Sequence, residues 1–433
     1  MTPLEIGIAG LAVLFVLLFM GLPVGICMGV VGFVGFALIS GLEPALGVIR
    51  IVPYSTFSSY SLSVIPLFVL MGNLAFHSGL SSDLYHTARA WLGRLRGGLA
   101  MSTVAACAAF AAISGSSVAT AATMGKIALP EMKKYGYSDE LATGTLAAGG
   151  TIGILIPPSV ILIIYGVLTE NSIGKLFLAG FIPGVLEAVF YMVTISILCF
   201  LNPALGPAAP PSKMREKLAS FKGSWGVLAL FLLVIGGIYF GIFSPVEAAG
   251  IGAFGTFLFG LARRKVGWRE FKDSLLDSTI TAAMIFIIML GANIFGYFLA
   301  VSGLPQSLAE AMVQLPVNRY VILLIIIIVY IILGCVMDSM AMILITVPIF
   351  YPLIIQLGFD PIWFGIIIVR MCEIGLITPP VGMNLYVIKG IRPEVPMGTL
   401  FRGVVPFIAT DCAHVLLLVG VPALSLFLPN LMK

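Results

Sequence analysis

The stretch AAISGSSVATAATMG, residues 111–125, gathers hydroxyl side chains and glycines within a chain that is otherwise strongly apolar. Of its 433 residues, 60% are hydrophobic and only 10% are charged. Soluble domains carry roughly 25% charged residues, so this chain has too few to cover a surface that faces water. Apolar runs of about 17–25 residues recur along its length and are typical of membrane-spanning helices. The composition therefore predicts an all-α polytopic membrane protein.

The basic residues predict how the chain is oriented in the membrane. Connectors with almost no Lys or Arg separate the basic clusters, which lie at residues 89–96, 133–134, 213–222, 263–272 and 389–392. The positive-inside rule places these clusters in the cytoplasm and both termini on the periplasmic side. No basic residue precedes the first apolar run, so we expect a retained span rather than a signal peptide. Segments 81–98 and 263–277 are basic and amphipathic, and we expect them to lie as short arms along the cytoplasmic interface.

Landmark prolines recur at a constant offset of 222 residues, which indicates an internal repeat. Pro130 corresponds to Pro352, and GILIPPSV at 153–160 corresponds to GLITPPVG at 375–382. The connector after Pro130 carries two lysines and the connector after Pro352 carries none, so the copies are predicted to face opposite sides, as in inverted-repeat transporters. The predicted units are a first inverted repeat at 1–201, a cytoplasmic linker at 202–223 and a second inverted repeat at 224–433.

Each copy contains two predicted breaks at membrane depth. The first break is a re-entrant hairpin. In the first copy it covers about 99–131 with its tip at Ser114–Ser117, and in the second copy it covers about 320–354 with its tip at Cys335–Ser339. The second is a helix split by a Pro-Pro pair, over about 139–168 and about 361–390, because proline lacks an N–H and clashes one turn earlier. The predicted fold has about 10 spans plus the two hairpins. Freed carbonyl and hydroxyl oxygens at such breaks suit an alkali cation, and small-residue helix packing is the alternative interpretation.

Charged residues inside apolar segments are functional candidates by default, because burying a charge in a membrane is costly. Asp338 ranks first, since it lies at a predicted hairpin tip. Arg370 and Glu373 are spaced i,i+3, and we expect them to pair with each other; direct binding of a substrate carboxylate by Arg370 is the alternative. Three further acidic residues are expected to be bundle-facing structural groups or interface contacts, namely Glu187, Glu247 and Asp411.

Four motifs, in this order, resemble the large membrane subunit of tripartite ATP-independent periplasmic (TRAP) transporters. They are ISGSSVATAATMG, GGTIGILIPPSV, MDSMAMILITVPIFYP and EIGLITPPVGMNLYV. The resemblance implies sodium-coupled uptake of an organic acid across the bacterial inner membrane by an elevator mechanism. It also implies a periplasmic substrate-binding protein and a small four-helix membrane subunit as partners, with Na⁺ as coupling ion and no other cofactor. A C4-dicarboxylate, a sialic acid or a similar carboxylate is the expected substrate.

The resemblance also implies roles for individual residues. One sodium site would comprise the first tip and the residues before the first proline pair, namely Ser114, Gly115, Ser116, Ser117, Gly153 and Pro157. Its mirrored counterpart would comprise Asp338, Ser339, Gly375, Thr378 and Pro379. The substrate would lie between the tips, near Thr120, Pro158, Met340, Arg370, Pro380 and Asn384.

Three alternative functions fit the sequence less well. A sodium/dicarboxylate elevator symporter that works without a binding protein belongs to the same broad class. An intramembrane hydrolase would need a catalytic partner for Ser116 or Asp338, and no GxGD, GxSxG or HExxH motif accompanies them. A channel is disfavoured because two mirrored re-entrant hairpins suit alternating access.

Overall fold

The computed structural model describes residues 1–432, which form helices joined by short connections and contain no strand. This confirms the all-helical prediction. Seven helical segments are long and apolar enough to cross a membrane: α4 (Val64–His77) with the short turn η1 (Tyr60–Ser63) before it, α10 (Ile173–Leu201), α11 (Met214–Tyr239), α12 (Pro245–Ala262), α13 (Trp268–Ser302), α16 (Ser339–Gln356) and α19 (Met397–Gly420).

The remaining helices are shorter or less apolar. Five are apolar but no longer than 17 residues: α1 (Pro3–Phe19), α2 (Val24–Ser40), α6 (Gly98–Ser114), α9 (Val160–Thr169) and α15 (Arg319–Gly334). The others are α3 (Leu42–Phe57), α5 (Leu80–Leu92), α7 (Ser117–Lys134), α8 (Asp139–Thr151), α14 (Leu304–Val313), α17 (Pro361–Gly375), α18 (Met383–Ile391) and α20 (Ala423–Leu431). Two further 3₁₀ turns are η2 (Ile152–Ile154) and η3 (Pro203–Leu205).

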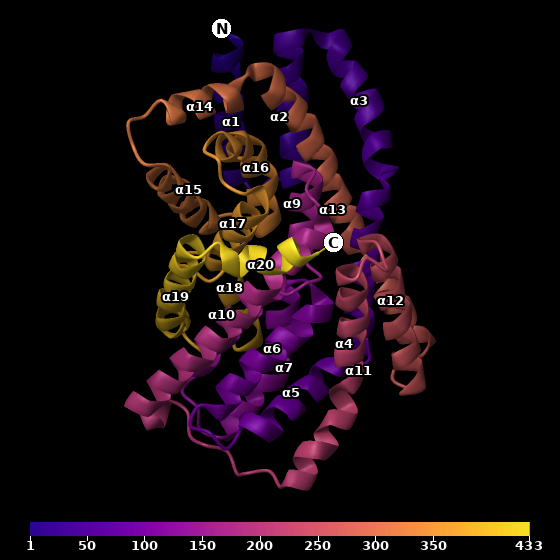
Figure 1. Ribbon diagram of the computed structural model, residues 1–433, viewed down its shortest axis with the longest axis vertical. Coiled ribbons are helices and arrows are strands. Elements are labelled where there is room, and N and C mark those ends of the chain that lie inside the picture. Colours follow the sequence, from indigo (N-terminus) through magenta and orange to yellow (C-terminus); the bar gives the residue numbers. More distant parts are fainter. Residues whose placement is uncertain (433) are drawn as a thin grey trace.

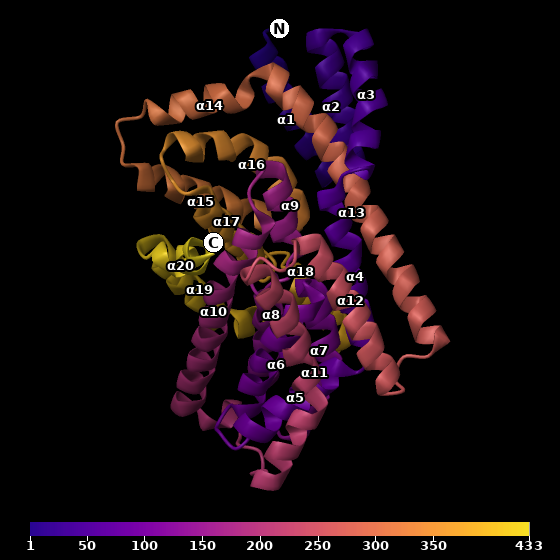
Figure 2. The same cartoon turned by 45° about the vertical axis from the view of Figure 1, so that its right-hand side comes forward.

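The two hairpins occupy opposite halves of the molecule. The pair α15 and α16 lies in the half that holds the N-terminus and α14, whereas α6 and α7 lie in the half that holds α5 and the start of α11 (Figures 1 and 2). Both pairs extend toward the middle of the long axis, where α9, α17 and α18 lie. The connection within each hairpin therefore lies near the middle of the long axis rather than at an end.

The helix bounds follow the offset seen in the sequence. Helices α6 to α9 begin at residues 98, 117, 139 and 160, and α15 to α18 begin at 319, 339, 361 and 383, which gives differences of 221, 222, 222 and 223. In each set the third and fourth helices are separated by a Pro-Pro pair whose peptide bond is cis. The side of the membrane that each copy faces stays a prediction.

Helices α2 and α13 approach each other backbone to backbone. A Cβ added to Gly25 would lie 2.7 Å from the carbonyl oxygen of Ile287, and one added to Gly32 would lie 2.7 Å from Cα of Phe295. Small residues permit this approach, which is how membrane helices gain packing energy where lipid supplies no hydrophobic driving force. The contact runs along most of α2 and along the C-terminal half of α13 (Figure 2).

One predicted element is different in the structure. Segment 263–277 was expected to form a short interfacial arm, but from Trp268 onward it is the first part of α13, which continues to Ser302. The physical reason is that no proline lies between these two residues, so nothing interrupts the backbone hydrogen bonds. In segment 81–98 the structure has the short helix α5, which ends at Leu92, and its place along the cytoplasmic interface stays a prediction.

Candidate functional site

The first hairpin tip is a tight turn between two helices. Helix α6 ends at Ser114, Gly115 has φ +60°, and α7 begins at Ser117. Glycine adopts this left-handed conformation at little cost, which explains its place at the end of α6. The side chain of Ser116 caps α7 by accepting a hydrogen bond from the Ala119 N–H at 3.4 Å. The hydroxyls of Ser114 and Thr120 lie 2.9 Å apart and join the two arms across the turn.

The second tip is a longer connection, residues 335–338, without a left-handed residue, and its second helix has a charged cap. Helix α15 ends at Gly334, and Asp338 precedes α16. The Asp338 carboxylate accepts hydrogen bonds from the N–H groups of Met340 at 2.9 Å and Ala341 at 3.1 Å, both through Oδ1. A carboxylate at a helix N-terminus is stabilised by these donors and by the helix dipole. Asp338 thus occupies the position in the second tip that Ser116 occupies in the first.

Each tip packs against the broken helix of its own copy. A Cβ added to Gly115 would lie 2.7 Å from the carbonyl oxygen of Pro158, and one added to Gly375 would lie 2.5 Å from Cα of Gly334. Real Cβ atoms do not approach other atoms so closely, so both contacts require glycine. Tip and broken helix therefore form one packed unit in each copy.

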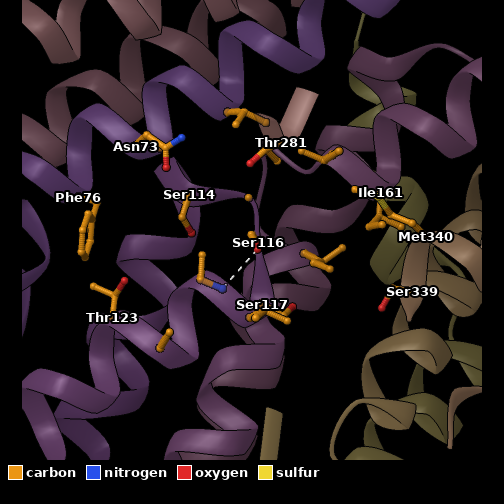
Figure 3. Close-up of a pocket in the computed structure, with 18 of the residues that line it drawn as sticks. Asn73, Phe76, Ser114, Ser116, Ser117, Thr123, Ile161, Thr281, Ser339 and Met340 are labelled. Carbon is orange, nitrogen blue, oxygen red and sulfur yellow. Dashed lines mark hydrogen bonds between the residues drawn. The ribbon is translucent and has the colours of Figure 1, made fainter. Parts of the chain in front are cut away.

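Both tips line a single cavity of about 560 Å³. Figure 3 shows Ser114, Ser116 and Ser117 of the first tip and Ser339 and Met340 of the second around this cavity. The remaining walls come mainly from α4, α9 and α13, the last contributing a second acidic side chain, Asp277, and also from η2, α18 and further residues of α6 and α7. Two helical arms from different halves of the sequence thus present hydroxyl and carboxylate oxygens to one space.

The predicted site residues fall into two groups. Those that line the cavity are Ser114, Gly115, Ser116, Ser117, Asp338, Ser339 and Met340. Those that do not line it are Thr120, Gly153, Pro157, Pro158, Arg370, Gly375, Thr378, Pro379, Pro380 and Asn384. Several of the second group lie directly behind the tips: a Cβ on Gly153 would be 3.4 Å from the Thr120 hydroxyl, and Asn384 donates a hydrogen bond to the Ala147 carbonyl at 3.3 Å.

Arg370 has partners other than the one expected. Its guanidinium lies 2.7 Å from the Glu187 carboxylate and also pairs with Asp411, and all three side chains are at most 1% exposed. The prediction that Arg370 pairs with Glu373 is therefore wrong. Tyr191 completes the cluster by donating its hydroxyl proton to Asp411 at 2.6 Å.

The acidic residues expected to be structural have different surroundings. Glu187 and Asp411 face the bundle as predicted, on α10 and α19. Glu247 does not face the bundle, because it is exposed and accepts a hydrogen bond from the Ser244 N–H at 2.8 Å, at the N-terminus of α12.

Glu373 is a site residue that the sequence interpretation missed. Its fully buried carboxylate accepts hydrogen bonds from Ser117 of the first tip and from Ser339 of the second, the latter at 3.2 Å. The two serines differ by 222 residues, and Glu373 lies two residues before Gly375 in the sequence. The available signal was an acidic residue close to a predicted helix break. The sequence interpretation instead paired this residue with Arg370, the basic residue one turn earlier on the same helix.

Two other wall residues carried no signal in the sequence. Lys126 of α7 and Asn73 of α4 both line the cavity. Asn73 donates a hydrogen bond to Ser278 of α13 at 2.8 Å, which ties the two wall helices together. Helices α4 and α13 lie outside the predicted hairpins, so their proximity could not be read from the repeat.

The sequence matches the profile of the family described as "Tripartite ATP-independent periplasmic transporter, DctM component" over residues 11–424. The chain belongs to this family. It is 40% identical to the C4-dicarboxylate TRAP transporter large permease protein DctM of Pseudomonas aeruginosa, over 87% of this chain and 88% of the relative. It is 32% identical to the sialic acid TRAP transporter large permease protein SiaM of Vibrio cholerae, over 96% of both chains.

A third relative is longer than this TRAP large subunit. The chain is 34% identical to the isethionate TRAP transporter permease protein DctMQ of Oleidesulfovibrio alaskensis, over 95% of this chain but 64% of that protein. The fold also resembles that of the Alcanivorax borkumensis YdaH transporter, with a TM-score of 0.62, 16% identity and coverage of 89% of this chain and 88% of that one. The TRAP assignment makes the chain a multi-pass membrane transporter and not an enzyme, which sets the hydrolase alternative aside.

Proposed function

We propose that this chain carries an organic acid across the bacterial inner membrane, coupled to the inward movement of sodium. Similar proteins in the family are described as permeases for C4-dicarboxylates, sialic acid and isethionate, all of which are organic anions. A C4-dicarboxylate, a sialic acid or a similar carboxylate is therefore the proposed substrate class. A periplasmic binding protein would deliver it, and a small four-helix membrane subunit would accompany this chain.

A single observation carries the proposal: both hairpin tips line the same cavity, and each tip is packed on a broken helix. Hydroxyl, carboxylate and free carbonyl oxygens are the ligands that suit an alkali cation. The proposed ligands are the tip residues named above together with the backbone before each proline pair. Between the tips lies the space for the substrate, bordered by Met340 and, behind the wall, by Thr120 and Asn384.

An elevator cycle is proposed from the packing. Because no Cβ fits between tip and broken helix, α6 to α9 and α15 to α18 would move together as one body. Helices α2 and α13, in backbone contact through Gly25 and Gly32, would form part of the frame. The proposed topology is an inverted repeat with both termini in the periplasm, as the distribution of basic residues favours.

The test is uptake of labelled substrate by proteoliposomes that contain the full chain, its small subunit and the cognate binding protein. An inward sodium gradient should drive uptake, and a potassium gradient should not. Asp338→Ala should abolish sodium-driven uptake, because the variant removes the only acidic side chain at either tip. Asp338→Asn keeps an oxygen for the helix cap and removes the charge, so it should also fail.

The matched control is Asp360→Ala. Asp360 caps α17 with the same geometry, accepting hydrogen bonds from Ile362 at 2.8 Å and Trp363 at 3.0 Å, but it is exposed and lies outside the cavity. Loss of such a cap costs about 1 kcal/mol of stability. The control should keep sodium-driven uptake. Undiminished sodium-dependent uptake by Asp338→Asn would overturn the assignment of Asp338 to a coupling site.

A further inference from the structure

Glu373 joins the two hairpin tips through one carboxylate. Ser117 donates its hydroxyl proton to one carboxylate oxygen, Oε2, and Ser339 donates to the other, Oε1, at 3.2 Å. The two serines are the first residues of α7 and α16, so each begins the second arm of its hairpin. All three side chains are at least nine-tenths buried. Helix α17, which carries Glu373, thus contacts both tips at equivalent positions.

The carboxylate has no basic partner in the part of the chain that the structure describes, residues 1–432. Arg370, one turn earlier on α17, is held by Glu187 and Asp411 instead. A buried acidic group at membrane depth is costly unless it is paired or marks an ion pathway. The protein retains one that is hydrogen-bonded to both tips, and no Lys or Arg side chain forms an ion pair with it among the described residues, so its charge is available to help balance that of a ligand.

The direction of the two hydrogen bonds decides what the serine oxygens can do. A serine hydroxyl has one proton to donate and two lone pairs to offer. Because both protons point at Glu373, the lone pairs of both oxygens point away from it. Carboxylates that accept hydrogen bonds from ligand groups orient those groups around a metal ion, and their removal typically lowers metal affinity about 10–100-fold.

We propose that Glu373 is a positioning residue shared by two sodium sites, which orients Ser117 and Ser339 as ligands and makes occupancy of one site favour occupancy of the other. This inference rests on the proposed sodium coupling. The linkage arises because one carboxylate accepts hydrogen bonds from both serine hydroxyls. A cation bound at one tip restrains that carboxylate, and the restrained carboxylate in turn holds the serine of the other tip in position. Linkage of this kind is reciprocal between the two sites.

The experiment measures sodium binding without transport. The full chain is purified, and its melting temperature is followed as NaCl replaces choline chloride at constant ionic strength. Binding to the folded state stabilises it by RT ln(1 + [Na⁺]/Kd) for each site. The slope of the melting temperature against ln[Na⁺] therefore rises in proportion to occupancy, and this slope plotted against sodium concentration is the sodium curve. The wild type should show a sodium curve steeper than single-site binding. Glu373→Gln should shift the midpoint at least about tenfold to higher sodium and reduce the steepness to that of independent sites.

Further variants separate the effect of the charge from that of the bridging geometry, and they provide a test that does not depend on the folding of Glu373→Gln. Glu373→Asp keeps the charge but is one methylene shorter, so it should also lose the steepness. Ser117→Ala and Ser339→Ala should be non-additive: the double variant should shift the midpoint by less than the product of the two single shifts. The matched control is Glu187→Gln, a buried carboxylate that touches neither tip, which should leave the sodium midpoint unchanged.

The outcomes distinguish this inference from the function on which it rests. A wild type whose melting temperature does not respond to sodium overturns both. If the wild type responds to sodium and a folded Glu373→Gln has the same midpoint and steepness, only the shared positioning role is overturned. If Glu373→Gln does not fold, the test uses Ser117→Ala, Ser339→Ala and the double variant. A double variant whose sodium midpoint shifts by the full product of the two single shifts refutes the linkage.

Discussion

Replacing Arg370 by methionine tests whether the buried charge cluster is structural. The guanidinium is completely buried, lies 2.7 Å from Glu187 and pairs with Asp411. It also lies 3.2 Å from the Tyr191 hydroxyl. These contacts join α17 to α10 and α19, which are distant in the sequence. Arg370→Met removes the positive charge and leaves two carboxylates close together with no counter-charge.

The expected loss is large because both acidic groups stay buried. Removing one partner of a buried ion pair typically costs about 3–5 kcal/mol, and here one removal strands two carboxylates. The loss is measured as the change in free energy of unfolding when the purified chain is titrated with denaturant. A loss of less than about 1 kcal/mol would show that the cluster contributes little and would refute the assignment.

A triple variant distinguishes a structural role from substrate binding. Arg370→Met combined with Glu187→Gln and Asp411→Asn removes all three charges, while the amide oxygens still accept from Tyr191 and Thr151. Neutralised clusters are often as stable as the ion pairs they replace, so most of the loss should be recovered. A triple variant no more stable than Arg370→Met would contradict this account. If the stable triple variant also transports, Arg370 does not bind the substrate carboxylate.

Three further outcomes follow from the tips and from the helix contacts. Gly375→Ala should lower stability by about 1–3 kcal/mol and impair uptake, since its Cβ would lie 2.5 Å from Gly334; Gly390→Ala, with nothing within 4 Å, is the control. Gly291→Ala should destabilise the contact of α13 with α2, as its Cβ would lie 2.0 Å from the Gly25 carbonyl, whereas Gly296→Ala on the same helix should be neutral in the same unfolding assay. Ser116→Ala should raise the sodium concentration for half-maximal uptake severalfold and leave the maximal rate, because backbone oxygens remain; an unchanged sodium curve would exclude a side-chain ligand there.

The helix breaks could be predicted because their causes are local. Proline removes a backbone donor wherever it stands, and the glycine between serines at the first tip permits a reversal, so helices α6 to α9 and α15 to α18 begin and end within a few residues of the ranges expected from the sequence. Their assignment to re-entrant hairpins and split helices of an inverted repeat stays a prediction. The first tip was expected at Ser114–Ser117, and the observed helices end and begin at those two residues. A repeated pattern at a fixed offset strengthened each local signal.

The partners of the buried charges could not be predicted, because they are set by tertiary packing. An i,i+3 pair on one helix is worth only about 0.2–0.5 kcal/mol, which is small beside the cost of leaving buried carboxylates unpaired. Arg370 therefore turns toward Glu187 and Asp411, and Glu373 is left to the serines of both tips. The cavity walls supplied by α4 and α13 were unpredictable for the same reason.

In both hairpins a side chain caps the second helix, but the caps are unequal, a neutral Ser116 on α7 and an anionic Asp338 on α16. The two hairpins therefore differ in charge although their helices follow the same 222-residue offset. A cation between the tips is drawn more strongly toward the second, since attraction to a nearby carboxylate exceeds that to a hydroxyl dipole. Occupancy should then begin at Asp338, so the ions would enter in a fixed order and leave in the reverse one.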